Sequence, residues 1–206
     1  MGKSYQKLFA RFYDSFMGDF ERSLFKTRRD MLQNIEGNVI EVGAGTGVNF
    51  KFYSDKAKVI AIEPSKPMLL EAEKKIGSNS NIDLVNYGVC DKELSNIIKE
   101  ESADYIVSML VLCTIPNPKK ALDYFKKWLK PGGKLIILEH IHAQKSHNKK
   151  IQNIINPAWR AFADGCNLNR NTDILLEEAG FKPISEEYIK RSLRFVKGVY
   201  RVVGSE

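Results

Sequence analysis

The sequence of 206 residues has few cysteines, no long apolar run and no low-complexity tract. Its three cysteines, Cys90, Cys113 and Cys166, are far apart and form no Cys-x-x-Cys pair, which argues against a disulfide framework and favours a reducing compartment. No apolar run approaches the ~20 residues of a membrane span. The first ten residues hold Lys3 and Lys7 but no apolar segment typical of a secretory signal. We therefore expect a cytoplasmic protein.

The charge is uneven along the chain. The net charge is +7, yet residues 38–139 carry 14 basic and 13 acidic side chains, so the excess lies on the two flanks. A basic flank can attract an anionic substrate, a phospholipid surface or nucleic acid, and it can also serve solubility alone. Peripheral contact with the inner face of an anionic membrane is one hypothesis that follows.

Apolar segments in the rest of the chain alternate with helical patterns. The first 36 residues read as a helical lid with a possible break at Gly18, because aromatic and leucine side chains recur there at helical spacing: Tyr5, Leu8, Phe9, Phe12, Tyr13, Phe16, Phe20 and Leu24. Residues 37–206 then predict one further domain. Strands are expected at 38–42, 58–62, 82–86, 104–112, 134–139, 182–190 and 195–203, and helices at 65–76, 118–130, 147–163 (interrupted by Pro157) and 172–179. Strands that are apolar on both faces and separated by helices predict a doubly wound, mostly parallel seven-stranded α/β sheet.

A glycine-rich loop follows the first expected strand. It reads Glu41-Val42-Gly43-Ala44-Gly45-Thr46-Gly47, and we expect it to open a helix. Such a loop lets a ligand approach the backbone closely. The spacing departs from the Gly-x-Gly-x-x-Gly dinucleotide fingerprint, because Val48 occupies the third glycine position. Glu41 would also repel a pyrophosphate, whereas it suits a cationic ligand.

A carboxylate ends the second expected strand. Glu63 lies 20 residues beyond Gly43, where an acidic side chain can accept hydrogen bonds from both hydroxyls of a ribose. A ligand with a ribose and a positive charge but no phosphate fits both features, and S-adenosylmethionine (SAM) is such a ligand. The alternative is a tight turn and a surface glutamate.

The stretch from Val39 to Glu139 resembles the class I SAM-dependent methyltransferases, which have a Rossmann-like fold. Tyr13-Asp14 is similar to a pair found in lids of that family, and Val89 stands where an aspartate is usual. The resemblance implies a SAM site, with S-adenosylhomocysteine as product. Its lining would be Tyr13, Glu41, Gly43, Ala44, Gly45, Thr46, Gly47, Glu63, Pro64, Ser65, Met68, Gly88, Val89, Cys90, Ser108, Met109 and Leu110.

The methyl acceptor is less well defined. The run Gly165-Cys166-Asn167-Leu168-Asn169-Arg170 is similar to a subgroup that includes bacterial phosphatidylethanolamine N-methyltransferases and thiol S-methyltransferases. The resemblance implies a phospholipid amine, a small amine or a thiol as acceptor, with Asp164 and Cys166 in its pocket. A soluble metabolite or quinone precursor is an alternative acceptor, and a non-catalytic module that binds SAM or S-adenosylhomocysteine is another alternative.

His140 is the predicted catalytic base, because it ends a core strand where a parallel sheet places its site. A histidine that is merely hydrogen-bonded at a strand end is the other interpretation. No group of His, Cys, Asp or Glu has metal-ligand spacing along the chain, so we expect no metal. We also expect no nucleic-acid partner, because Cys113-Thr114-Ile115-Pro116 stands where an Asn-Pro-Pro-Tyr motif would follow the fourth strand.

Overall fold

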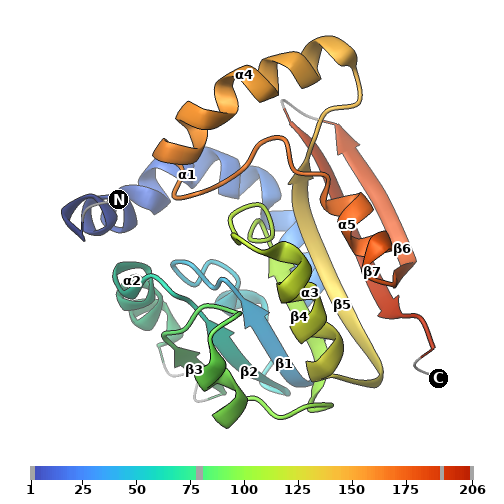
Figure 1. The fold of residues 1–206 in the computed structure, drawn as a ribbon. Coiled ribbons are helices and arrows are strands. Elements are labelled where there is room, and N and C mark those ends of the chain that lie inside the picture. Colours follow the sequence, from blue (N-terminus) through green and yellow to red (C-terminus); the bar gives the residue numbers. More distant parts are fainter. Residues whose placement is uncertain (1–2, 78–80, 191–192, 205–206) are drawn as a thin grey trace. The chain divides into compact units, whose positions relative to one another are not determined.

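The computed structural model describes residues 3–77, 81–190 and 193–204. Its seven strands form a sheet in the order β3-β2-β1-β4-β5-β7-β6 (Figure 1). The strands are β1 (Gly37–Val42), β2 (Ala57–Ile62), β3 (Ile82–Val85), β4 (Ala103–Met109), β5 (Leu129–Ile141), β6 (Phe181–Lys190) and β7 (Arg194–Val202). The helices are α1 (Lys3–Leu32), α2 (Lys66–Ile76), α3 (Pro118–Trp128), α4 (Ser146–Phe162) and α5 (Thr172–Glu178), with short 3-10 helices η1 (Phe50–Phe52) and η2 (Lys92–Asn96). The predicted α/β fold class is confirmed.

The chain divides into two compact units. One contains the residues up to Ile98 together with Ala103–Tyr105. In this unit β1 pairs in parallel with β2, and β2 pairs in parallel with β3. The last four residues of β1 are all buried, as expected for a parallel strand covered on both faces. Helices α1 and α2 contact each other and η1.

The other unit contains Lys99–Ser102 and the residues from Ile106 onward. Here β5 and β7 are antiparallel, as are β6 and β7. Helices α3 and α5 contact each other and β5 (Figure 1). Nearly all of β6 is exposed, and its charged residues protect an outer strand from pairing with other chains.

Two expected helix breaks do not occur. Helix α1 continues through Gly18 and α4 continues through Pro157. A glycine costs a helix about 1 kcal/mol and a proline about 3 kcal/mol, but helices of 30 and 17 residues retain their other hydrogen bonds. The aromatic stripe of α1 is only partly covered, since Leu24 is buried while Leu8 and Phe12 are exposed. The side chain of Phe16 lies outside the described residues.

Three other boundaries differ from the prediction. Strand β4 ends at Met109 because Leu110 has a φ of +64°, although the apolar run continues to Leu112. Strand β5 begins at Leu129, so it includes the Pro131–Gly133 turn that was expected to precede it. The glycine loop leads into turns and η1 rather than an α-helix. None of the helices formed by the described residues has the length and hydropathy to cross a membrane.

Candidate active site

The glycine loop in the first unit requires glycine for two different reasons. Gly43, Gly45 and Gly47 all have positive φ, at 66°, 57° and 74°. A Cβ on Gly47 would lie 2.7 Å from ring atoms of Phe50, so this position also has no space for a side chain. A Cβ on Gly45 would meet no atom within 4 Å. The backbone at Gly45 is therefore open to an approaching ligand.

Glu63 joins the glycine loop to the end of β2. Its Oε2 accepts a hydrogen bond from Gly45 N at 2.9 Å, and its Oε1 accepts one from Ser65 N at 2.7 Å. The N–H groups of Gly43 and Ala44 donate to Ile62 O at 2.8 and 3.0 Å. The structure thus places the predicted ribose-binding carboxylate beside the predicted loop. A carboxylate oxygen can accept more than one hydrogen bond.

Glu41 has a different environment from the one that its sequence position suggested. Its carboxylate is buried and accepts hydrogen bonds from Asn49 Nδ2 at 2.9 Å and from the Tyr53 hydroxyl at 2.8 Å. Arg28 Nη1 donates to Asn49 Oδ1 at 2.8 Å. Burial raises the pKa of Glu41 to about 7, despite the lowering effect of these partners. Glu41 therefore supports the base of the loop through side chains of its own unit.

Helix α1 also reaches this loop. Thr46 Oγ1 donates to Asp14 Oδ1 at 2.6 Å, and Lys75 Nζ of α2 donates to Thr46 Oγ1 at 3.1 Å. Lys75 also forms an ion pair with Asp14. Tyr13 is the neighbour of Asp14, and its ring lies 5.5 Å from that of Phe9. Sequence reasoning missed Asp14 as a loop contact, although the Tyr13-Asp14 resemblance pointed to this turn of the helix.

The loops after β2 and β3 are linked by Asn86. Its Nδ2 donates to Glu63 O at 2.8 Å and to Pro64 O at 3.0 Å. Asp91 accepts a hydrogen bond from Gly88 N at 2.6 Å, which closes the loop containing the other residues expected near adenine. Met68 and Val89 are buried, whereas Gly88 and Cys90 are partly exposed. The first unit therefore brings the predicted loop, ribose and adenine positions together.

The second unit holds the remaining predicted residues. Glu139 is fully buried in β5, and its Oε1 accepts hydrogen bonds from Ser108 Oγ at 3.2 Å, Val111 N at 2.8 Å and Leu112 N at 2.9 Å. Leu110 N donates to Leu138 O at 2.8 Å. Burial raises the pKa of Glu139 to about 7. This carboxyl group shapes the turn after β4, a role that the sequence reading did not assign to it.

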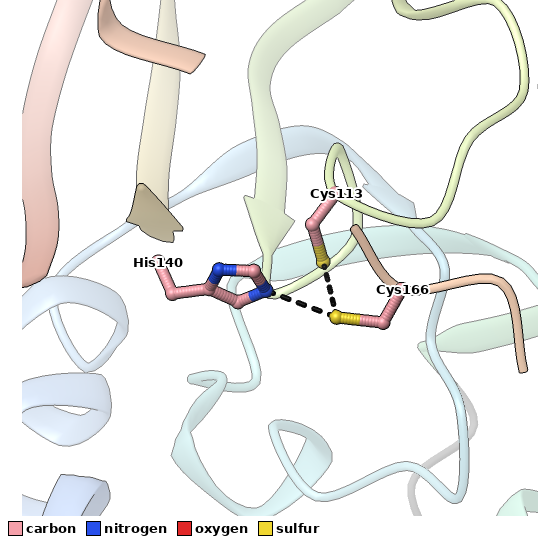
Figure 2. A group of neighbouring side chains, drawn as sticks. All are labelled: Cys113, His140 and Cys166. Atoms are coloured by element: carbon pink, nitrogen blue, oxygen red, sulfur yellow. Dashed lines mark hydrogen bonds between the residues drawn. The ribbon is translucent and has the colours of Figure 1, made fainter. Parts of the chain in front are cut away.

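His140 lies in a group with two cysteines (Figure 2). Its Nε2 is 3.0 Å from Cys166 Sγ, and Cys166 Sγ is 3.6 Å from Cys113 Sγ. Cys113 and His140 are buried and Cys166 is partly buried. The Nδ1 atom of His140 is also buried, and no described residue offers it a hydrogen-bond partner. The expected lone base is thus part of a cluster.

The pKa values of the three side chains in this cluster are shifted in different directions. Hydrogen bonds from Cys113 and His140 outweigh burial and lower the pKa of Cys166 to about 4. The hydrogen bond to Cys166 and burial raise the pKa of Cys113 well above its usual value. Burial opposes a charged imidazole, yet the bond to the Cys166 thiolate raises the pKa of His140. These shifts favour the thiolate form at Cys166 over the thiolate form at Cys113.

The expectation of no metal rested on spacing along the chain, and the fold removes that reason. Cys113, His140 and Cys166 each offer one ligand atom, and these atoms all lie within 4.8 Å of one another. The three residues come from the turn after β4, the end of β5 and the loop after α4. His140 is 27 residues from Cys113 and 26 residues from Cys166 along the chain, so no sequence pattern revealed the group. Contacts between the loops that carry the two cysteines bring it together.

The strand order, the glycine loop after β1 and the carboxylate at the end of β2 define a class I SAM-dependent methyltransferase. The Methyltransferase domain family model matches residues 9–186, so the chain belongs to that family. Thiol S-methyltransferase TMT1A of Homo sapiens is 32% identical over 191 residues, which cover 90% of this chain and 77% of that protein. SAM is accordingly the cofactor of this chain, which is an enzyme.

One further sequence relative and one solved structure match this chain over different lengths. Phosphatidylethanolamine N-methyltransferase of Cereibacter sphaeroides is 28% identical over 110 residues, covering 53% of each chain. Among solved structures, a SAM-dependent methyltransferase from Aquifex aeolicus superposes with a TM-score of 0.62 at 18% identity, covering 86% of this chain and 88% of that one. The structural likeness supports the fold alone, while the two sequence relatives are a thiol S-methyltransferase and a phosphatidylethanolamine N-methyltransferase.

Proposed function

We propose that this methyltransferase transfers the methyl group of SAM to a small thiol. The observation that carries the proposal is the extent of similarity to thiol S-methyltransferase TMT1A, which covers 90% of this chain. Similarity to the phosphatidylethanolamine N-methyltransferase covers 53%. The longer match includes more of the residues that can line an acceptor pocket, so it is the better guide to the acceptor.

In this proposal the first unit holds the cofactor. The open backbone at Gly45 receives SAM, and the Glu63 carboxylate beside it accepts hydrogen bonds from the ribose hydroxyls. Glu41 holds Asn49 and Tyr53 beneath the loop and does not contact the sulfonium through its carboxylate. The loops containing Pro64, Ser65, Met68 and Gly88–Cys90 form the adenine side. Tyr13, from the predicted lid, would lie over this site. Ser108–Leu110 belong to the other unit, and their role at the cofactor stays a prediction.

The reaction is an in-line displacement. A lone pair of the acceptor sulfur forms the new S–CH₃ bond while the methyl–sulfonium bond breaks, and S-adenosylhomocysteine leaves as a neutral thioether. The protein supplies alignment and a dry site, since the sulfonium already activates the methyl group. A thiol must also lose its proton, because the thiolate is the nucleophile. His140 is the predicted base for that proton. Its Nε2 lies 3.0 Å from Cys166 Sγ, so the two side chains would share the proton.

A phospholipid amine is the second candidate acceptor. Helix α4 exposes Ile151, Ile154 and Ile155 beside Lys149 and Lys150. An apolar strip flanked by lysines is suited to the interface of an anionic membrane. This feature supports peripheral membrane contact, which would equally serve an enzyme that methylates apolar thiols.

The test is a methyl-transfer assay of the full chain with labelled SAM. The panel contains alkyl and aryl thiols, phosphatidylethanolamine vesicles, small primary amines and phenolic quinone precursors, and products are identified by mass spectrometry. We expect thioethers from thiols and no methylated amine. Methylation of phosphatidylethanolamine without methylation of any thiol would overturn the proposal.

A further inference from the structure

The spacing of Cys113, Cys166 and His140 is close to that of a tetrahedral zinc site. Zinc bonds of about 2.3 Å to sulfur and about 2.0–2.1 Å to nitrogen give tetrahedral edges of about 3.8 Å between sulfurs and about 3.5 Å from sulfur to nitrogen. The observed Sγ–Sγ distance is 3.6 Å, and the Cys166 Sγ to His140 Nε2 distance is 3.0 Å. The third pair lies within 4.8 Å. Shifts of about 0.2 Å, 0.5 Å and at most about 1.3 Å would therefore seat the metal.

Contacts other than the ligand side chains hold the two cysteine loops together. Asn167 donates to Cys113 O twice, from its backbone N at 3.0 Å and from Nδ2 at 2.9 Å. Arg170 Nη1 donates to Ile115 O at 2.7 Å and also to Leu112 O. These bonds fix the turn that carries Cys113 against the loop that carries Cys166. The ligand atoms are thus positioned before any metal binds, which lowers the ordering cost of binding.

The donor set selects the kind of metal. Two thiolates and an imidazole suit zinc, whereas magnesium and calcium prefer oxygen ligands. Three protein ligands are the number found in catalytic zinc sites, which keep the fourth position for water or substrate, and structural sites instead have four protein ligands. No other group of three such side chains occurs among residues 3–77, 81–190 and 193–204.

We propose that Cys113, Cys166 and His140 bind Zn²⁺ and leave its fourth position open to the thiolate of the methyl acceptor. The second half of this statement rests on the proposed function. As the acceptor sulfur binds the metal, its proton passes to solvent. A metal-bound thiolate is the nucleophile that the proposed reaction requires. With zinc bound, His140 Nε2 is a ligand, so the metal takes over the activation of the thiol from the imidazole.

The first measurement is the zinc content of the full chain, purified with a phosphine reductant and separated from free metal by gel filtration. We expect about one zinc per chain in the wild type, since a structural or catalytic site of this kind retains its metal. The variants Cys113→Ser, Cys166→Ser and His140→Asn should each bind zinc at least about a hundredfold more weakly, because changes to mere neighbours of ligands already cost about 10–100-fold. Cys90→Ser and His147→Asn are matched controls outside the cluster and should retain the metal.

Cobalt(II) substitution reports the ligands directly. A sulfur-to-cobalt charge-transfer band should be present in the wild type and weaken in either cysteine variant. Cys166 lies on a partly exposed loop, so Cys166→Ser gives a folded comparison even if Cys113→Ser does not fold. Addition of a thiol acceptor should shift the band, and no shift would overturn the open fourth position.

Two results would overturn the metal site itself. One is a wild-type zinc content no higher than that of Cys166→Ser. The other is a Cys113–Cys166 disulfide without zinc in the reduced, freshly purified chain. Neither result would overturn methyl transfer to a thiol, because that activity is measured separately in the assay with labelled SAM. Conversely, zinc binding with amine methylation alone would overturn the thiol acceptor and leave the metal site intact.

Discussion

Gly45→Ala separates the cofactor contact of the glycine loop from its conformational strain. Gly45 has a φ of +57°, and an added Cβ would meet no atom within 4 Å. The left-handed conformation alone should therefore cost roughly 1–2 kcal/mol of stability. If SAM approaches this backbone, the new methyl group occupies the ligand's space. Overpacking of that size costs about 1–3 kcal/mol, or roughly a 5- to 150-fold rise in Kd.

The assay is calorimetric titration of S-adenosylhomocysteine, paired with urea unfolding of the same samples. Gly180→Ala is the matched control, because Gly180 also has a positive φ of 86° with nothing within 4 Å of an added Cβ. Gly180 follows α5 in the other unit. Both variants should lose stability to a similar degree, and only Gly45→Ala should lose affinity. An unchanged Kd in a folded Gly45→Ala protein would refute the assignment of the loop as the cofactor's backbone contact.

Three other predictions concern stability and surfaces. Burial raises the pKa of Glu41 and Glu139 from 4.5 to about 7. Each carboxyl group therefore contributes up to about 3 kcal/mol to the free energy of unfolding, present below pH 4.5 and lost as pH rises through about 7. Urea unfolding should show this fall in stability, and Glu41→Gln should remove about half of it. A flat profile in the wild type would contradict that assignment. Gly47→Ala should destabilise the chain more than Gly45→Ala, since its Cβ would lie 2.7 Å from the Phe50 ring, and equal melting temperatures would contradict this. Binding to anionic vesicles should weaken as salt rises and on Ile154→Asp; equal binding to neutral vesicles at any salt would exclude electrostatic docking.

The regular part of the fold was predictable because its signals are local. Apolar runs separated by helical patterns in the sequence predicted the positions of all seven strands to within a few residues. The 20-residue spacing predicted that Glu63 ends the strand after the glycine loop, and in the structure Glu63 accepts a hydrogen bond from Gly45 of that loop. The boundaries failed where hydrophobicity continued beyond regular structure, as at Leu110, whose positive φ ends β4 inside an apolar run. The predicted break at Pro157 was wrong for the opposite reason, because a long helix tolerates one missing hydrogen bond.

The cysteine–histidine cluster could not be predicted, because no local rule brings its members together. Cys113 was read as following a strand that ended at Leu112. It lies in a turn that Glu139 and Arg170 hold in place. That turn depends on a buried carboxyl group accepting backbone N–H groups from a neighbouring segment. Glu41 shows the same limit, since its partners Asn49 and Tyr53 come from turns that replaced the expected helix.

The most direct test of the central claim is calorimetric titration of the full chain with SAM, S-adenosylhomocysteine and NAD. Wild type should bind the first two with a Kd in the micromolar range and should not bind NAD. Glu63→Ala should weaken both by roughly 10- to 150-fold, the equivalent of one hydrogen bond to a charged group, while the exposed control Glu73→Ala should not. Binding of NAD without binding of SAM would contradict the account, because the glycine loop and Glu63 would then serve a different cofactor.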